Sequence, residues 1–113
     1  MIDKERFEKL LEDYPKAKTV TEGAEEFIFL PHAKVTLLDG NEAELDMLLC
    51  PHLREGKPTR LYFSKQLKTR RPRNWGPSRI LEKEWHAISW NGVEASLSYS
   101  EMIAEHIGAL IRE

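Results

Sequence analysis

Residues 45–63 read LDMLLCPHLREGKPTRLYF, and this stretch decides the fold. It begins inside a run over residues 44–50 that is apolar enough to form a central strand of a sheet. Pro51 ends that run, a polar loop follows over residues 52–57, and a short strand is predicted over residues 59–63. Because proline has no backbone donor, it marks the place where one strand stops before the next begins. The stretch therefore predicts two strands joined by a short loop.

The residues before this stretch predict more antiparallel sheet. Strand-like segments cover residues 24–30, which stop at Pro31, and residues 33–38, in which apolar and polar positions alternate. Asp39 and Gly40 then mark a turn, because both residue types tolerate positive φ. We predict an antiparallel meander over this part of the chain.

An amphipathic helix is predicted over residues 3–14. Its apolar positions recur at the 3.6-residue spacing of one helix face, and they are Phe7, Leu10, Leu11 and Tyr14. Asp3 is a suitable N-cap, and Pro15 ends the helix at the residue before it.

Beyond residue 63 the pattern changes twice. Residues 64–81 show no period and contain two prolines and a glycine, which indicates a long loop. Strands over 85–90 and 93–97 flank Asn91-Gly92, the strongest short signal for a hairpin, and place Trp90 on an apolar face. A final helix over residues 98–111 begins with the capping box Ser98-Tyr99-Ser100-Glu101.

Length and composition describe a single α+β domain over residues 1–113. The chain is 41% hydrophobic and 32% charged, with a net charge of −2, which favours neither nucleic acid nor membranes globally. It has one cysteine and four scattered histidines, so no internal disulfide, metal site or cofactor is predicted. The charged N-terminal residues and the lack of a long apolar run predict a cytoplasmic protein with no signal peptide and no membrane partner.

The order of helix, meander, proline-punctuated loop and C-terminal helix resembles the ubiquitin-conjugating (UBC-like) fold. The resemblance is sharpest where Cys50-Pro51 leaves one strand, Pro58 follows, and Leu61 and Phe63 enter the next strand. The bacterial family E branch of this superfamily is similar over most of residues 22–112. The segments that carry this similarity are Phe27-Ile28-Phe29-Leu30-Pro31, Gly40, Leu45-Asp46-Met47-Leu48-Leu49, Leu61-Tyr62-Phe63, and the pair Trp85 and Ser89.

The resemblance implies a role in a bacterial ubiquitin-like conjugation pathway, with a ubiquitin-like protein or its activating enzyme as partner. Conjugating enzymes carry the ubiquitin-like C-terminus as a thioester on a cysteine that follows a His-Pro-Asn signature. This chain has neither that signature nor any cysteine after Pro51. We therefore expect a non-catalytic binding or scaffold subunit.

An active conjugating enzyme that uses Cys50 is the alternative. His52 lies two residues further along, so both side chains share one face if the strand continues past Pro51. Cys50 and His52 are therefore the candidate catalytic residues, although a cysteine at the end of an apolar strand is more often a small buried hydrophobe.

A basic segment covers residues 57–81. It contains eight Lys or Arg and no Asp or Glu. Because the net charge of the whole chain is −2, the remaining residues carry a net charge of −10. Such a segment favours an acidic protein partner or, as a second alternative function, a nucleic-acid-binding module with a tryptophan as stacking platform. A solvated loop that balances acidic helices would look the same. The candidate binding residues are Lys65, Lys68, Arg70, Arg71, Arg73, Trp75 and Arg79.

Overall fold

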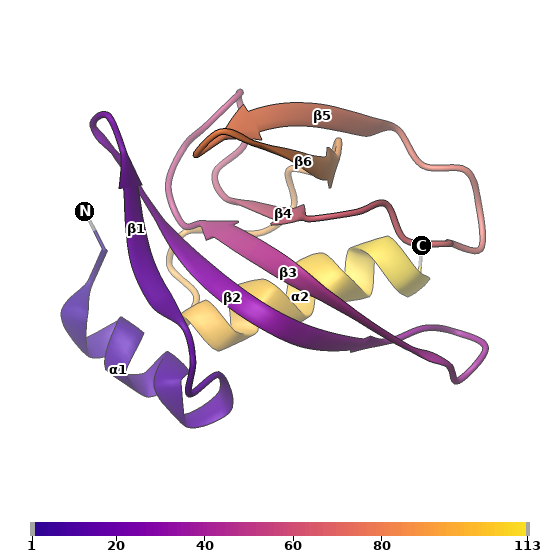
Figure 1. Ribbon diagram of the computed structural model, residues 1–113, viewed down its shortest axis with the longest axis horizontal. Helices are drawn as coiled ribbons and strands as arrows, with labels where there is room; N and C mark the ends of the chain where they lie inside the picture. Colours follow the sequence, from indigo (N-terminus) through magenta and orange to yellow (C-terminus); the bar gives the residue numbers. More distant parts are fainter. Residues whose placement is uncertain (1, 113) are drawn as a thin grey trace.

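A computed structural model describes residues 2–112 as a six-stranded antiparallel sheet with two helices (Figure 1). The strand order is β1-β2-β3-β4-β6-β5, so the first four strands form an antiparallel meander, in which β1 was not predicted and β2 joins two strands that were predicted separately. The elements are α1 Lys4–Asp13, β1 Lys18–Glu22, β2 Glu25–Thr36, β3 Glu42–Cys50, β4 Arg60–Phe63, β5 Trp75–Ile80, β6 Lys83–Ile88 and α2 Tyr99–Arg112. The α+β class is confirmed. Within these residues, neither helix combines the length and apolar character that crossing a membrane requires.

Both helices begin where their caps predict. The Asp3 side chain accepts a hydrogen bond from the Arg6 backbone N–H at 3.0 Å, which fixes the start of α1. At α2, the Ser98 hydroxyl accepts from the Glu101 N–H at 3.2 Å and donates to the Glu101 carboxylate at 2.8 Å. Ser98 therefore caps α2 as predicted, but the Glu101 carboxylate accepts from the Ser98 hydroxyl and not from its backbone N–H as in a full capping box.

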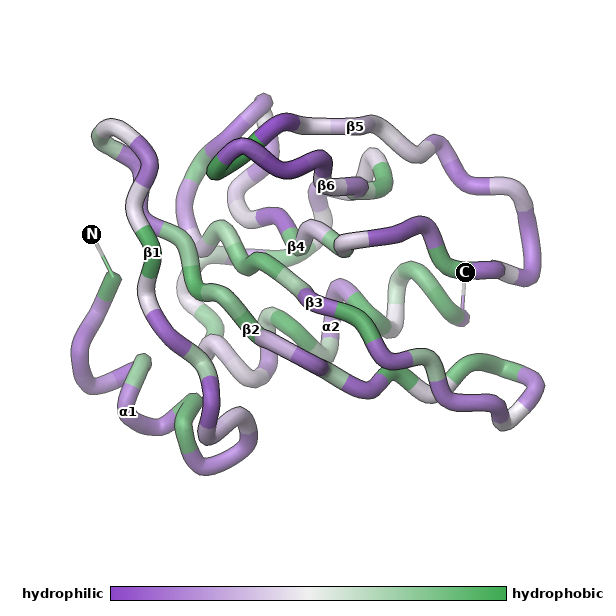
Figure 2. The backbone as a smooth tube through the Cα atoms, in the orientation of Figure 1, coloured by the Kyte–Doolittle hydropathy of each residue, from purple (hydrophilic) through white to green (hydrophobic). Residues whose placement is uncertain are grey.

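The sheet has an apolar core on each face. The larger core lies between the sheet and the two helices, and Figure 1 shows α2 running behind β2 and β3. The smaller core lies on the face without helices and contains Phe27, Leu48, Cys50, Tyr62, Ile80, Trp85 and Ala87. Because successive strand residues face opposite sides, β3 and β4 need apolar residues at almost every position (Figure 2). This explains the apolar runs at residues 45–50 and 61–63.

The smaller core is closed by curvature of the sheet. The Leu81 backbone N–H, in the β5–β6 turn, donates to the Glu22 carboxylate at the end of β1. Phe29 of β2 and Trp85 of β6 meet edge to face, with ring centroids 6.3 Å apart, although β3 and β4 lie between their strands. The two edges of the sheet therefore bend toward each other over this face.

The predicted hairpin around Asn91-Gly92 is wrong. β6 pairs instead with β5, and Trp85 lies opposite Ser78. The turn between them is Leu81-Glu82, whose φ angles of 54° and 64° belong to the left-handed region of a type I′ turn. Residues 75–80, predicted as loop, thus form a strand, while residues 93–97 form none. Trp85 and Ala87 belong to the smaller core, so burial outweighed the local turn signal.

The expected strand end at Pro31 is also wrong. β2 continues through it to Thr36, with a bulge between Leu30 and Ala33 where the pairing to β3 shifts. His32 has a φ of 50°, and its N–H donates to the Asp46 carboxylate at 2.9 Å. Proline is tolerated here because the bulge requires no ladder donor from it.

Candidate functional site

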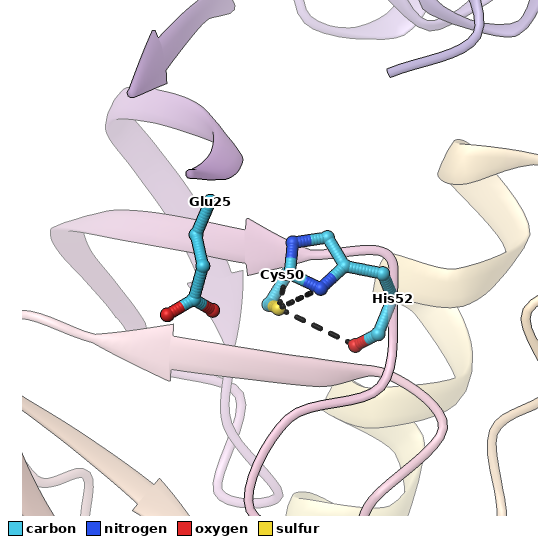
Figure 3. A group of neighbouring side chains, drawn as sticks. All are labelled: Glu25, Cys50 and His52. Atoms are coloured by element: carbon cyan, nitrogen blue, oxygen red, sulfur yellow. Dashed lines mark hydrogen bonds between the residues drawn. The ribbon is translucent and has the colours of Figure 1, made fainter. Parts of the chain in front are cut away.

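Cys50 and His52 lie together where β3 ends. The Cys50 Sγ is 3.6 Å from both ring nitrogens of His52 and 3.4 Å from the His52 carbonyl oxygen (Figure 3). The His52 Nε2 is 3.0 Å from the Glu26 carbonyl oxygen of β2. The two candidate catalytic residues are therefore in contact, even though the strand stops at Cys50.

The Cys50 thiol lies in the smaller core with 0% of its surface exposed. Burial raises its pKa to about 11, against a smaller opposing effect of the hydrogen bond to the His52 backbone. A nucleophilic cysteine needs a thiolate and access for the substrate carbonyl. At neutral pH the described geometry holds a protonated thiol beneath other side chains, which is poorly suited to attack.

Glu25, at the start of β2, is the third member of this group. One carboxylate oxygen, the Cys50 sulfur and a His52 ring nitrogen all lie within 4.8 Å of one another. Figure 3 shows Glu25 and His52 on either side of the Cys50 sulfur in that view. The antiparallel register causes this proximity, because Ile28 pairs with Leu49 and earlier β2 residues therefore meet the end of β3. The sequence gives no sign of Glu25 because 25 positions separate it from Cys50.

A charged network holds one side of this group. Glu25 accepts from Arg54 at 2.9 Å, and Arg54 also donates to the Tyr62 hydroxyl at 2.7 Å. Tyr62 and Arg60 both donate to one carboxylate oxygen of Glu55, at 2.6 and 2.9 Å. Burial alone would raise the pKa of Glu55, but the bond from Tyr62 and the two guanidinium groups lower it overall. Arg60 is therefore engaged in structure and is not a free cation of the basic segment.

Two of the seven candidate binding residues have structural contacts. The Arg73 guanidinium donates to the carbonyl oxygens of Ala109 and Leu110, at 2.8 and 3.2 Å, and so caps the C-terminus of α2. Trp75 is half-buried, with its ring edge to face against Phe63 at 6.0 Å. Arg73 and Trp75 therefore have structural roles that require no ligand.

The other five candidate binding residues are exposed, and they are Lys65, Lys68, Arg70, Arg71 and Arg79. Within residues 2–112, none of the five forms an ion pair. The segment between β4 and β5 is largely hydrophilic in Figure 2, at the side of the molecule where the β2–β3 turn also lies. Five cations are thus presented to solvent, four of them on one segment.

A groove of about 510 Å³ lies between that segment and the β2–β3 turn. One wall is Leu37, Leu38 and Asp39, and the other is residues 68–70. Leu38 is 55% exposed, so the groove presents a large apolar side chain to solvent opposite two cations. Sequence reasoning assigned the two leucines to a strand and did not identify this surface. The only signal was the apolar pair next to the Asp39-Gly40 turn.

A comparison of the chain with known protein families, with characterised proteins and with solved structures finds no match.

Proposed function

We propose that this chain is a non-catalytic binding module that holds an acidic segment of a partner protein in the groove between the β2–β3 turn and residues 68–70. The groove joins the exposed Leu38 and the half-buried Leu37 to the cations Lys68 and Arg70. That combination suits a peptide segment with an apolar anchor next to Asp or Glu. The exposed Leu38 across the groove from these two cations is the observation that carries the proposal.

The resemblance to the UBC-like superfamily gives the proposal its partner. The chain has a helix, a four-strand meander and, after the β5–β6 pair, a C-terminal helix, and this order supports the resemblance. The partner is then a ubiquitin-like protein or its activating enzyme in a bacterial conjugation pathway. The buried, protonated Cys50 supports a scaffold role, because a thioester carrier needs an accessible thiolate.

Titration of the ¹⁵N-labelled chain with the purified ubiquitin-like protein and activating enzyme of the same genome tests the partner. We expect amide shift changes at residues 37–39 and 68–70. Replacing both Lys68 and Arg70 with Glu should weaken binding by about tenfold or more, since opposite charges would become like charges. Lys65→Glu is the matched control, because Lys65 is an exposed cation outside the groove lining. If the partner binds saturably and the double substitution leaves its affinity unchanged, the groove is not the binding site. If neither protein binds, the proposed partner is wrong.

Thioester transfer by Cys50 is a second candidate, motivated by its contact with His52. Incubation with the activating enzyme, ATP and the ubiquitin-like protein would then give an adduct that thiols cleave and that Cys50→Ala abolishes. We expect no such adduct.

Nucleic-acid binding is a third candidate, motivated by the five exposed cations. It predicts an affinity for single-stranded DNA that falls steeply between 50 and 200 mM salt, because counterions are released on binding. We expect weak binding without a stacking contribution, since Trp75 packs against Phe63.

A further inference from the structure

We propose that Glu25, Cys50 and His52 form a binding site for one zinc ion, with sulfur, nitrogen and oxygen ligands and an open fourth position. The three ligand atoms come from the start of β2 and the end of β3, and they lie within 4.8 Å of one another. This site goes beyond the binding function proposed above and uses a different part of the molecule.

The distance between sulfur and nitrogen suits a tetrahedral zinc ion. Zinc bonds of about 2.3 Å to sulfur and about 2.0 Å to nitrogen place these two atoms about 3.5 Å apart at a tetrahedral angle. The Cys50 Sγ and His52 Nδ1 are 3.6 Å apart. Two ligands therefore have the required separation already.

A neighbouring carbonyl group orients the imidazole. The Glu26 carbonyl oxygen can only accept, so the 3.0 Å contact places a proton on His52 Nε2 and leaves Nδ1 as the ligand atom. Histidines that bind zinc usually donate their other N–H to a carbonyl or carboxylate in this way. The unprotonated Nδ1 makes no hydrogen bond to the Leu53 carbonyl oxygen 3.3 Å away, because both atoms can only accept, so its lone pair is available to the ion.

Glu25 provides the entrance and the oxygen ligand. Its side chain is 41% exposed, whereas Cys50 lies beneath it, so an ion approaches from the Glu25 side. Arg54 donates to one oxygen of the Glu25 carboxylate at 2.9 Å, so the second oxygen can bind the ion while this pair stays formed. Arg54 is held in place by its bonds to Tyr62 and Glu55.

Binding releases one proton. The Cys50 thiol gives up its S–H proton to water and the sulfur becomes a thiolate bound to Zn²⁺, so charge and atoms balance without any redox step. No oxidant or reductant is needed. The reaction makes zinc affinity fall as the pH falls, because the proton competes with the ion for sulfur.

Cobalt(II) is the spectroscopic probe for this site, because it occupies tetrahedral zinc sites and gives a thiolate charge-transfer band in the near ultraviolet. Anaerobic titration of the reduced chain should give one equivalent of bound Co²⁺ with this band, and Zn²⁺ should displace it. Cys50→Ala should remove the band. His52→Ala and Glu25→Gln should each weaken Co²⁺ binding by more than about tenfold, the loss that removal of even an outer-shell partner produces.

His32→Ala is the matched control, since His32 is an exposed histidine away from this group. Cys50 is buried, so thermal unfolding checks that Cys50→Ala is folded, and the more exposed His52 and Glu25 variants carry the test independently. No charge-transfer band up to millimolar Co²⁺ would overturn the proposal. A band that His52→Ala and Glu25→Gln leave unchanged would also overturn it, because the thiol alone would then be the ligand.

Discussion

His106 lies in the contact between α2 and the residue before β4, where burial makes the fold sensitive to mild acid. The side chain is 6% exposed, and its Nε2 is 2.9 Å from the Thr59 hydroxyl oxygen. That hydroxyl donates to the Val93 carbonyl oxygen at 3.0 Å, so it accepts from His106. Burial, together with a smaller contribution from the Arg60 guanidinium, lowers the pKa of His106 from 6.5 to about 4. The folded state therefore holds a neutral imidazole.

The pH window and the magnitude follow from these two pKa values. The unfolded chain binds a proton at His106 near pH 6.5, whereas the folded chain does so only near pH 4. Between these values the unfolded state holds more protons, so the free energy of unfolding decreases as the pH falls. From pH 7 to pH 5 the loss is about 2 kcal/mol, and below about pH 4 this group causes no further loss. For a chain of this size that corresponds to a Tm decrease on the order of 8 °C.

Guanidinium unfolding at pH 7, 6 and 5, followed by circular dichroism, measures this loss. His106→Gln is the matched variant, because its amide N–H can still donate to the Thr59 hydroxyl but does not titrate. We expect the variant to lose about 2 kcal/mol less stability than the wild type between pH 7 and pH 5. Equal losses in both chains would refute the assignment of acid sensitivity to His106.

Three further predictions test other features of the molecule. The buried Cys50 should react with an aromatic disulfide reagent at pH 7.5 only as fast as the chain opens, and fully in denaturant; rapid labelling of the native chain would contradict its burial. Arg73→Ala should lower the free energy of unfolding by about 1 to 2 kcal/mol, because α2 loses its C-terminal cap, whereas Arg71→Ala should leave it unchanged. Glu82→Gly should raise the free energy of unfolding by about 0.5 to 1 kcal/mol, because glycine relieves the positive φ of 64°; a decrease in denaturation midpoint would show that this turn is unstrained.

The sequence predicted those helices and strands that are determined by residues close together along the chain. Asp3 and Ser98 cap their helices through bonds to the next turn, so both starts are visible in the sequence. The apolar run at 45–50 identified β3 because burial on both faces removes the alternation of an exposed strand. These predictions depend on neighbours along the chain and needed no tertiary information.

Tertiary packing decided what the sequence left open. The β5–β6 turn uses Leu81-Glu82, which has no Gly or Asn, whereas Asn91-Gly92 carries the hairpin signal but forms no hairpin. Glu25 meets Cys50 only through the register of β2 against β3. The sequence predicted Arg73 as a surface cation, because the charge pattern around it does not show that it bonds a helix end 36 residues away.

The two proposed sites lie at opposite ends of the β2–β3 hairpin, and this separation makes them independent. Glu25 and Cys50 are at its open end, while Leu37 and Leu38 are at its turn. The nine residues of β3 alone span on the order of 27 Å, several times the screening length of about 8 Å in physiological salt. Charge reversal at the groove should therefore leave Co²⁺ affinity unchanged, and loss of His52 should leave partner binding unchanged. If the chain fails to bind Co²⁺, the proposed partner binding is therefore unaffected. If it fails to bind the partner, the zinc proposal is likewise unaffected.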